Sequence, residues 1–137
     1  MNKLDKFTLA YIEAALWSTT DDDEDPLDAN YDIDDLHQST LEAAVRDCKK
    51  FQAEMAQFIT DEHRITKGSG KYSVDELAGH DFWLTREGHG AGFFDGDWSD
   101  EADVAMTAKS NEFGQANWYV GDDGKIYQLG EETVDED

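Results

Sequence analysis

The feature that most constrains the fold is a long run of apolar residues at helical spacing, from Ser39 to about residue 62. Ser39 and Glu42 have the S-x-x-E spacing of a capping box, which is typical of a helix start. The apolar positions then recur three and four residues apart: Leu41, Ala44, Val45, Cys48, Phe51, Met55, Phe58 and Ile59. A helix with such a face needs partners to cover it, so the chain must build a core around this element.

The only cysteine, Cys48, falls on that apolar face and is predicted to be buried and unreactive. One cysteine cannot form an internal disulfide, which fits a reducing compartment. The N-terminal residues lack the cleavage site of a signal peptide, and no window holds about 18 apolar residues in a row. We therefore expect a cytoplasmic protein.

Three further helices are predicted from periodicity and capping residues. They cover residues 3–18, a short segment from Ser73 to about Gly79 with a Ser73–Glu76 capping box, and a segment that begins at Asp97 or Ser99 and stops at Gly114.

Two stretches are predicted to form β-hairpins: "GHDFWLTREGHGAGFFDGDW" (79–98) and "NWYVGDDGKIYQL" (117–129), the latter with an Asp-Gly turn. The expected fold class is α+β, with N-terminal helices packed on a small antiparallel sheet built from two C-terminal hairpins. We expect one domain over residues 1–130 and an acidic tail over 131–137.

The stretch 79–98 raises the question of a catalytic or metal site, because it holds two histidines and several carboxylates. The spacing of His80, His89, Asp95 and Asp97 matches no zinc or iron motif, and neither a G-x-S-x-G nucleophile motif nor an EF-hand is present. The structural interpretation is therefore favoured, with Phe82 and Leu84 on one face of a strand. Arg86 and His89 are then expected to be exposed at the loop tip.

Charge is the strongest global signal, with 33 acidic against 11 basic residues and a formal net charge of −22. Such a surface repels nucleic acid and anionic membranes, and it attracts basic grooves. Solubility, adaptation to high salt and imitation of nucleic acid all remain open as explanations. Imitation requires the carboxylates to gather on one side, because an even spread would fall well below the charge density of DNA.

Residues 19–38, the acidic loop, hold nine acidic residues and no basic one. Pro26 favours a turn. Four apolar residues could anchor the segment to the body of the protein: Leu27, Tyr31, Ile33 and Leu36. An ordinary solvated loop is the alternative interpretation.

Three stretches, "AYIEAALWSTTDDDEDPLDANYDIDDL", "AGHDFWLTREGHGAGFFDGDW" and "YVGDDGKIY", resemble in this order a family of small, uncharacterised acidic proteins of bacteriophages and prophages. The resemblance implies a virus-encoded protein of the bacterial cytoplasm with helices followed by hairpins. It carries over no activity and no catalytic residue. It does favour accessory roles against the host.

The leading hypothesis is a non-enzymatic phage-type inhibitor, without metal or cofactor, that imitates nucleic acid. Its carboxylates would occupy a basic nucleic-acid-binding groove of a host or defence protein. The candidate partner-binding residues are Asp21, Asp22, Asp23, Glu24, Asp25, Asp28, Asp32, Asp34, Asp35, Asp95, Asp97, Asp100, Glu101 and Asp103, with a third cluster at Glu131, Glu132, Asp135, Glu136 and Asp137. The sequence is compatible with a homodimer, which would lengthen such a charged track.

Two alternatives stay open. The first is an accessory protein that binds its partner through the aromatic hairpin of residues 79–98, with the acidity serving solubility. The second is a small metal-dependent enzyme centred on His80 and His89.

Overall fold

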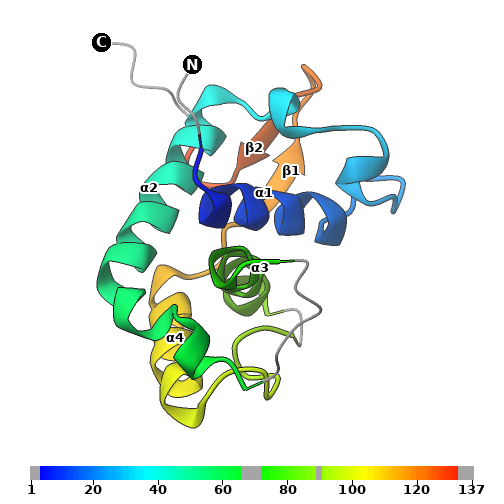
Figure 1. Ribbon diagram of the computed structural model, residues 1–137. Coiled ribbons are helices and arrows are strands. Elements are labelled where there is room, and N and C mark those ends of the chain that lie inside the picture. The colour runs from blue at the N-terminus through cyan, green and yellow to red at the C-terminus, as the bar shows by residue number, and fades with distance from the viewer. Residues whose placement is uncertain (1–3, 66–71, 89–90, 133–137) are drawn as a thin grey trace.

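Four helices and one two-stranded sheet make up the part of the chain that the computed structural model describes, which is residues 4–65, 72–88 and 91–132 (Figure 1). The helices are α1 (Lys6–Ser18), α2 (Gln38–Met55), α3 (Val74–Glu87) and α4 (Asp100–Phe113). The strands are β1 (Trp118–Val120) and β2 (Ile126–Gln128). The predicted α+β class is confirmed, and the protein is mostly helical.

The core is centred on α1 and α3, which pack directly against each other. Gly79 of α3 lies so close to α1 that a Cβ atom there would overlap the carbonyl oxygen of Phe7. This close approach brings aromatic rings together in the core. The rings of Phe51 from α2 and Phe82 from α3 stack with centroids 4.2 Å apart, and Phe7 contacts both.

The long amphipathic helix is present as α2, but it differs from the prediction at both ends. Its N-cap is His37, whose Nδ1 accepts a hydrogen bond from the Ser39 backbone N–H, so the predicted capping box at Ser39 is wrong. Ser39 is itself buried and bonds to the His37 ring. After Met55 the chain continues in two short 3-10 turns, Ala56–Phe58 and Asp61–His63. Cys48 is fully buried, as predicted.

The predicted hairpin at residues 79–98 is wrong. The Ser73–Glu76 capping box, which is confirmed, starts a helix that continues to Glu87 and ends at Gly88 in the left-handed conformation. Phe82 and Trp83, which suggested the first strand, instead lie on the core side of this helix. Phe93 and Phe94, which suggested the second strand, lie beyond the helix, and only Phe93 of the two is buried. Buried positions such as Ala78 and Phe82 are four residues apart, which is helical spacing. The high β-propensity of the aromatic residues favoured strands instead and led to the wrong prediction.

The second predicted hairpin is confirmed. Within the described residues, its two strands make up the entire sheet. β1 and β2 pair antiparallel with Tyr119 opposite Tyr127, across a turn in which Gly124 takes a φ of +80°. The sheet is thus built from one hairpin and not from two. The predicted helix from Ser99 to Gly114 is confirmed as α4, with Ser99 as N-cap and Gly114 as C-cap.

Arg86 connects all four helices, in contrast to its predicted place at an exposed loop tip. Its side chain is only 3% exposed and forms an ion pair with Asp47 of α2 at 3.0 Å. One guanidinium nitrogen also donates to the Tyr11 hydroxyl of α1 at 2.9 Å. The other nitrogens donate to the carbonyl oxygens of Phe113 and Gly114 at the end of α4.

We expect Arg86→Met to lower the free energy of unfolding by about 3–5 kcal/mol, because it leaves Asp47 Oδ2 and two carbonyl groups without the guanidinium that they bind. Urea unfolding followed by circular dichroism measures this change. The matched control is Arg46→Met, since Arg46 contacts the other Asp47 oxygen but its side chain is 55% exposed. The control should cost less than about 1 kcal/mol. Equal losses in both variants would contradict the central role of Arg86.

Candidate functional site

The acidic loop is an ordered part of the fold between α1 and α2. Two 3-10 turns, Leu27–Ala29 and Ile33–Asp35, shape it, and a bridge pairs Thr20 with Pro26. Leu27 is fully buried and Leu36 is 7% exposed, so these two predicted anchors do hold the loop to the core. Tyr31 and Ile33 are partly buried against the same core.

Three of the nine carboxylates in the loop are used to fold it. Asp21 Oδ1 accepts hydrogen bonds from the backbone N–H groups of Asp23 and Asp25 at 2.8 and 3.1 Å. Asp32 and Asp35 form a reciprocal capping box around the second turn. These bonds position the remaining, exposed carboxylates, which belong to Asp22, Asp23, Glu24, Asp25, Asp28 and Asp34.

The second predicted cluster lies elsewhere on the molecule. Asp100, Glu101 and Asp103 occupy the first turn of α4, where negative charge is stabilised by the helix dipole. Figure 1 shows that this turn lies at the end of the molecule away from the acidic loop. Asp95 accepts a hydrogen bond from the Gly92 N–H, and Asp97 is half-buried. The structure therefore does not join this cluster and the acidic loop into one surface.

The third cluster is described only in part. Glu131 forms an ion pair with Arg46 at 3.2 Å, and Glu132 accepts a hydrogen bond from the Tyr119 hydroxyl at 2.9 Å. The two described residues of the predicted tail thus contact the body of the protein. Asp135, Glu136 and Asp137 lie outside the described residues.

The described residues of the stretch 79–98 bury four of their five large aromatic rings. Phe82, Trp83, Phe93 and Trp98 are each at most 1% exposed, and Phe94 is the exposed ring. The alternative of a partner-binding aromatic hairpin therefore loses its structural basis, because these rings fill the core.

The histidines of that stretch give no sign of a metal centre in the described ranges. His80 lies on α3, with its Nε2 3.8 Å from a Glu13 oxygen and its ring edge-on to Tyr72. Burial lowers the pKa of His80, although Glu13 opposes the effect. Within residues 4–65, 72–88 and 91–132, no group of three or more His, Cys, Asp or Glu side chains could hold a metal ion. His89 lies outside the described residues.

Asp81 is the titratable group of α3 whose environment is most unusual. Burial raises its pKa from 3.8 to about 6, and the charges of Asp95 and Asp97 add to this effect. A hydrogen bond of 2.8 Å from Trp98 Nε1 and the charge of Arg64 act in the opposite direction. The Arg64 guanidinium lies over the Trp98 ring, 4.9 Å from its centroid. The sequence did not predict that the Asp81 carboxyl group is buried, because its burial depends on the loop that follows α3.

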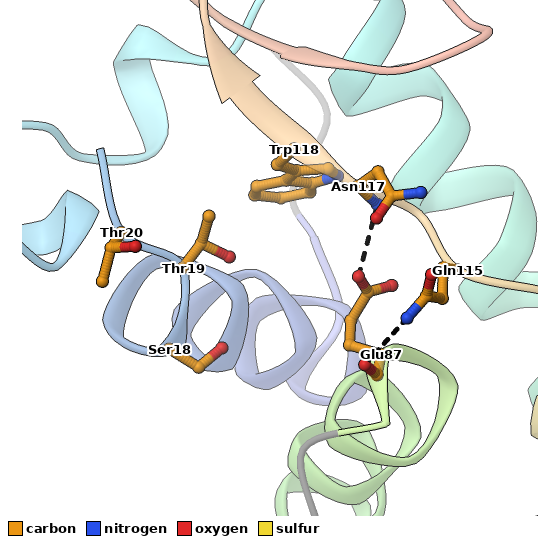
Figure 2. Close-up of a pocket in the computed structure, with 7 residues that line it drawn as sticks. All are labelled: Ser18, Thr19, Thr20, Glu87, Gln115, Asn117 and Trp118. Carbon is orange, nitrogen blue, oxygen red and sulfur yellow. Dashed lines mark hydrogen bonds between the residues drawn. The ribbon is translucent and has the colours of Figure 1, made fainter. Parts of the chain in front are cut away.

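A shallow polar hollow of about 270 Å³ lies between the end of α1, the end of α3 and the start of β1 (Figure 2). Glu87, Gln115 and Asn117 lie together on one side of it, and Ser18, Thr19 and Thr20 lie on the other (Figure 2). The Glu87 carboxylate accepts hydrogen bonds from the backbone N–H groups of Ala116 and Asn117, and Gln115 Nε2 donates to the Glu87 carbonyl. These polar groups hold the start of β1 against α3. The polar groups on that side of the hollow thus serve to join β1 to α3.

A row of aromatic rings on the surface was not predicted from the sequence. The rings of His37, Tyr127 and Tyr119 form a stacked row on the outer face of the hairpin. The pairing of the two tyrosines could not be predicted from the Asp-Gly signal, because a two-residue Asp123-Gly124 turn would place Tyr119 opposite Gln128. In the structure three residues lie between the paired Gly121 and Lys125, and this loop sets Tyr119 opposite Tyr127. The contact with His37 is long-range and has no local sequence signal.

No family model, curated protein or solved structure matches this chain. The resemblance to phage proteins therefore stays a prediction. No helix among the described residues has the length and apolar character needed to cross a membrane.

We expect Asp81→Asn to change how stability depends on pH. Between pH 3.8 and about 6 the folded protein keeps a proton that the unfolded chain releases, so the free energy of unfolding falls as pH rises through this window. The neutral amide should remove this loss, and the variant should exceed the wild type by up to about 3 kcal/mol near pH 7. Near pH 3.5 the two proteins should be nearly equal. Urea unfolding at both pH values tests this, and a difference that does not vary with pH would contradict it.

Proposed function

We propose that this protein is an acidic inhibitor that occupies a basic nucleic-acid-binding groove of another protein, with the acidic loop as its contact surface. The observation that carries the proposal is the ordered acidic loop itself. It holds nine carboxylates and no basic residue within residues 19–38. None of the ion pairs found within the described ranges uses a carboxylate of this loop.

The proposed mechanism is competitive binding in place of phosphate groups. Lysine and arginine side chains of the partner would pair with the exposed carboxylates of Asp22, Asp23, Glu24, Asp25, Asp28 and Asp34. Because the loop is already held by Leu27, Leu36 and its internal hydrogen bonds, little ordering is needed on binding. The net charge of −22 would also speed the encounter with a basic surface at low salt.

The proposal is limited to the acidic loop. The first turn of α4, which holds Asp100, Glu101 and Asp103, lies apart from the acidic loop (Figure 1), so the second cluster is left out of the proposed contact. The partner class follows from charge, and binding of this kind needs neither a cofactor nor a metal ion. We place the partner in the cytoplasm of a bacterial host, which is what the resemblance to phage proteins implies.

Competition for proteins retained on DNA tests the proposal. The probe is the fraction of a bacterial lysate that stays on double-stranded DNA resin at low salt. We expect the wild-type chain to elute a basic protein from the resin. The variant Asp22→Asn/Asp23→Asn/Asp28→Asn should need roughly tenfold more protein for the same elution, since three exposed ion pairs at about 0.5 kcal/mol each are lost.

The matched control is Asp61→Asn/Glu62→Gln/Asp75→Asn, which removes the same number of charges from exposed positions outside the acidic loop. It should elute the same protein as the wild type does. Equal weakening in both triple variants would show that only overall charge matters and would overturn the assignment of the loop. Elution that is unchanged at about 0.5 M salt would contradict an electrostatic mechanism.

A further inference from the structure

The outer face of the hairpin carries a row of aromatic rings beside the acidic loop. Tyr119 and Tyr127 are directly opposite each other in the two strands, and their side chains point away from the core. Their neighbours Trp118 and Gln128 are buried on the inner face. The two tyrosine rings lie 5.8 Å apart at an angle of 22°, close to parallel.

A third ring extends the row on the far side of β2. The His37 backbone N–H donates to the Ile126 carbonyl oxygen, which places His37 along the edge of the strand that β1 does not cover. Its ring stacks on Tyr127 with centroids 4.6 Å apart. Tyr127 is therefore enclosed between two rings. Tyr119 ends the row and is 39% exposed.

Both tyrosine hydroxyl groups donate to carboxylates at the rim of this face. Tyr127 donates to Asp123 Oδ2 at 2.6 Å, and Tyr119 donates to Glu132 Oε2 at 2.9 Å. These hydrogen bonds lower the pKa of both carboxyl groups, so each is charged at neutral pH. The turn adds Asp122 against a single basic residue, Lys125.

An aromatic ring face flanked by carboxylates has the chemistry that recognises arginine. The guanidinium group is planar, stacks on aromatic rings and donates hydrogen bonds in a fork that matches a carboxylate. No cation of the chain itself contacts the rings of this face within the described ranges. The cation–ring contacts in these ranges fall on Phe82, Trp98 and Phe113.

We propose that this face binds an arginine side chain of a basic partner protein, with the guanidinium stacked on Tyr119 and paired with Glu132. The inference rests on the proposed function and deepens it, because His37 directly joins this face to the acidic loop. The acidic loop attracts positive charge of any kind. The aromatic face adds a preference for arginine over lysine.

Fluorescence anisotropy with two labelled peptides of equal length and charge tests this inference. One alternates glycine with arginine, and the other alternates glycine with lysine. We expect the wild-type chain to bind the arginine peptide roughly two- to fivefold more tightly at low salt, which is the effect of one exposed cation–π contact. Tyr119→Leu should remove this preference, whereas Tyr119→Phe keeps the ring and should retain most of it.

The matched control is Phe94→Leu, which removes an exposed aromatic ring, 45% exposed, from a different part of the surface. It should leave the preference for arginine unchanged. Equal affinity of the wild type for both peptides, or an unchanged preference in Tyr119→Leu, would overturn the inference while leaving the proposed function intact. Failure of both peptides to bind would overturn the two together.

Discussion

The buried guanidinium of Arg86 is the interaction on which the rest of the structure depends. It contacts α1 through Tyr11, α2 through Asp47 and the end of α4 through two carbonyl oxygens. A buried charge is tolerated only when its hydrogen-bonding groups are satisfied, so these partners must stay in place together. The acidic loop runs from the end of α1 to the start of α2. Fixing these two helices relative to each other therefore also fixes both ends of the loop.

The parts of the fold that depend on local signals could be predicted from the sequence. The capping box at Ser73 and the turn signal before Lys125 act within a few residues, and the helix start and the hairpin that they predict are both confirmed. The prediction of a hairpin after Gly79 was wrong because the aromatic residues there have high β-propensity. Packing against α1 decides that this segment is helical. The position of Arg86 was also predicted wrongly, because no local signal in the sequence indicates that this charged residue is buried beside Asp47.

The candidate site shows the same division between local and long-range information. The acidic loop and its anchors Leu27 and Leu36 could be read directly from composition and spacing. The sequence did not show which carboxylates bond to the backbone of the loop and which remain exposed. Asp21 belongs to the first group and Asp22 to the second. The aromatic row was also missed, because it needs His37 to meet a strand far along the chain.

The central claim is that the acidic loop is held in one conformation by the body of the protein. The most direct measurement is the backbone order parameter of residues 21–35 by NMR relaxation. The account predicts values near about 0.85, as in rigid helices. Values below about 0.6 across these residues would show a flexible chain and would contradict the account.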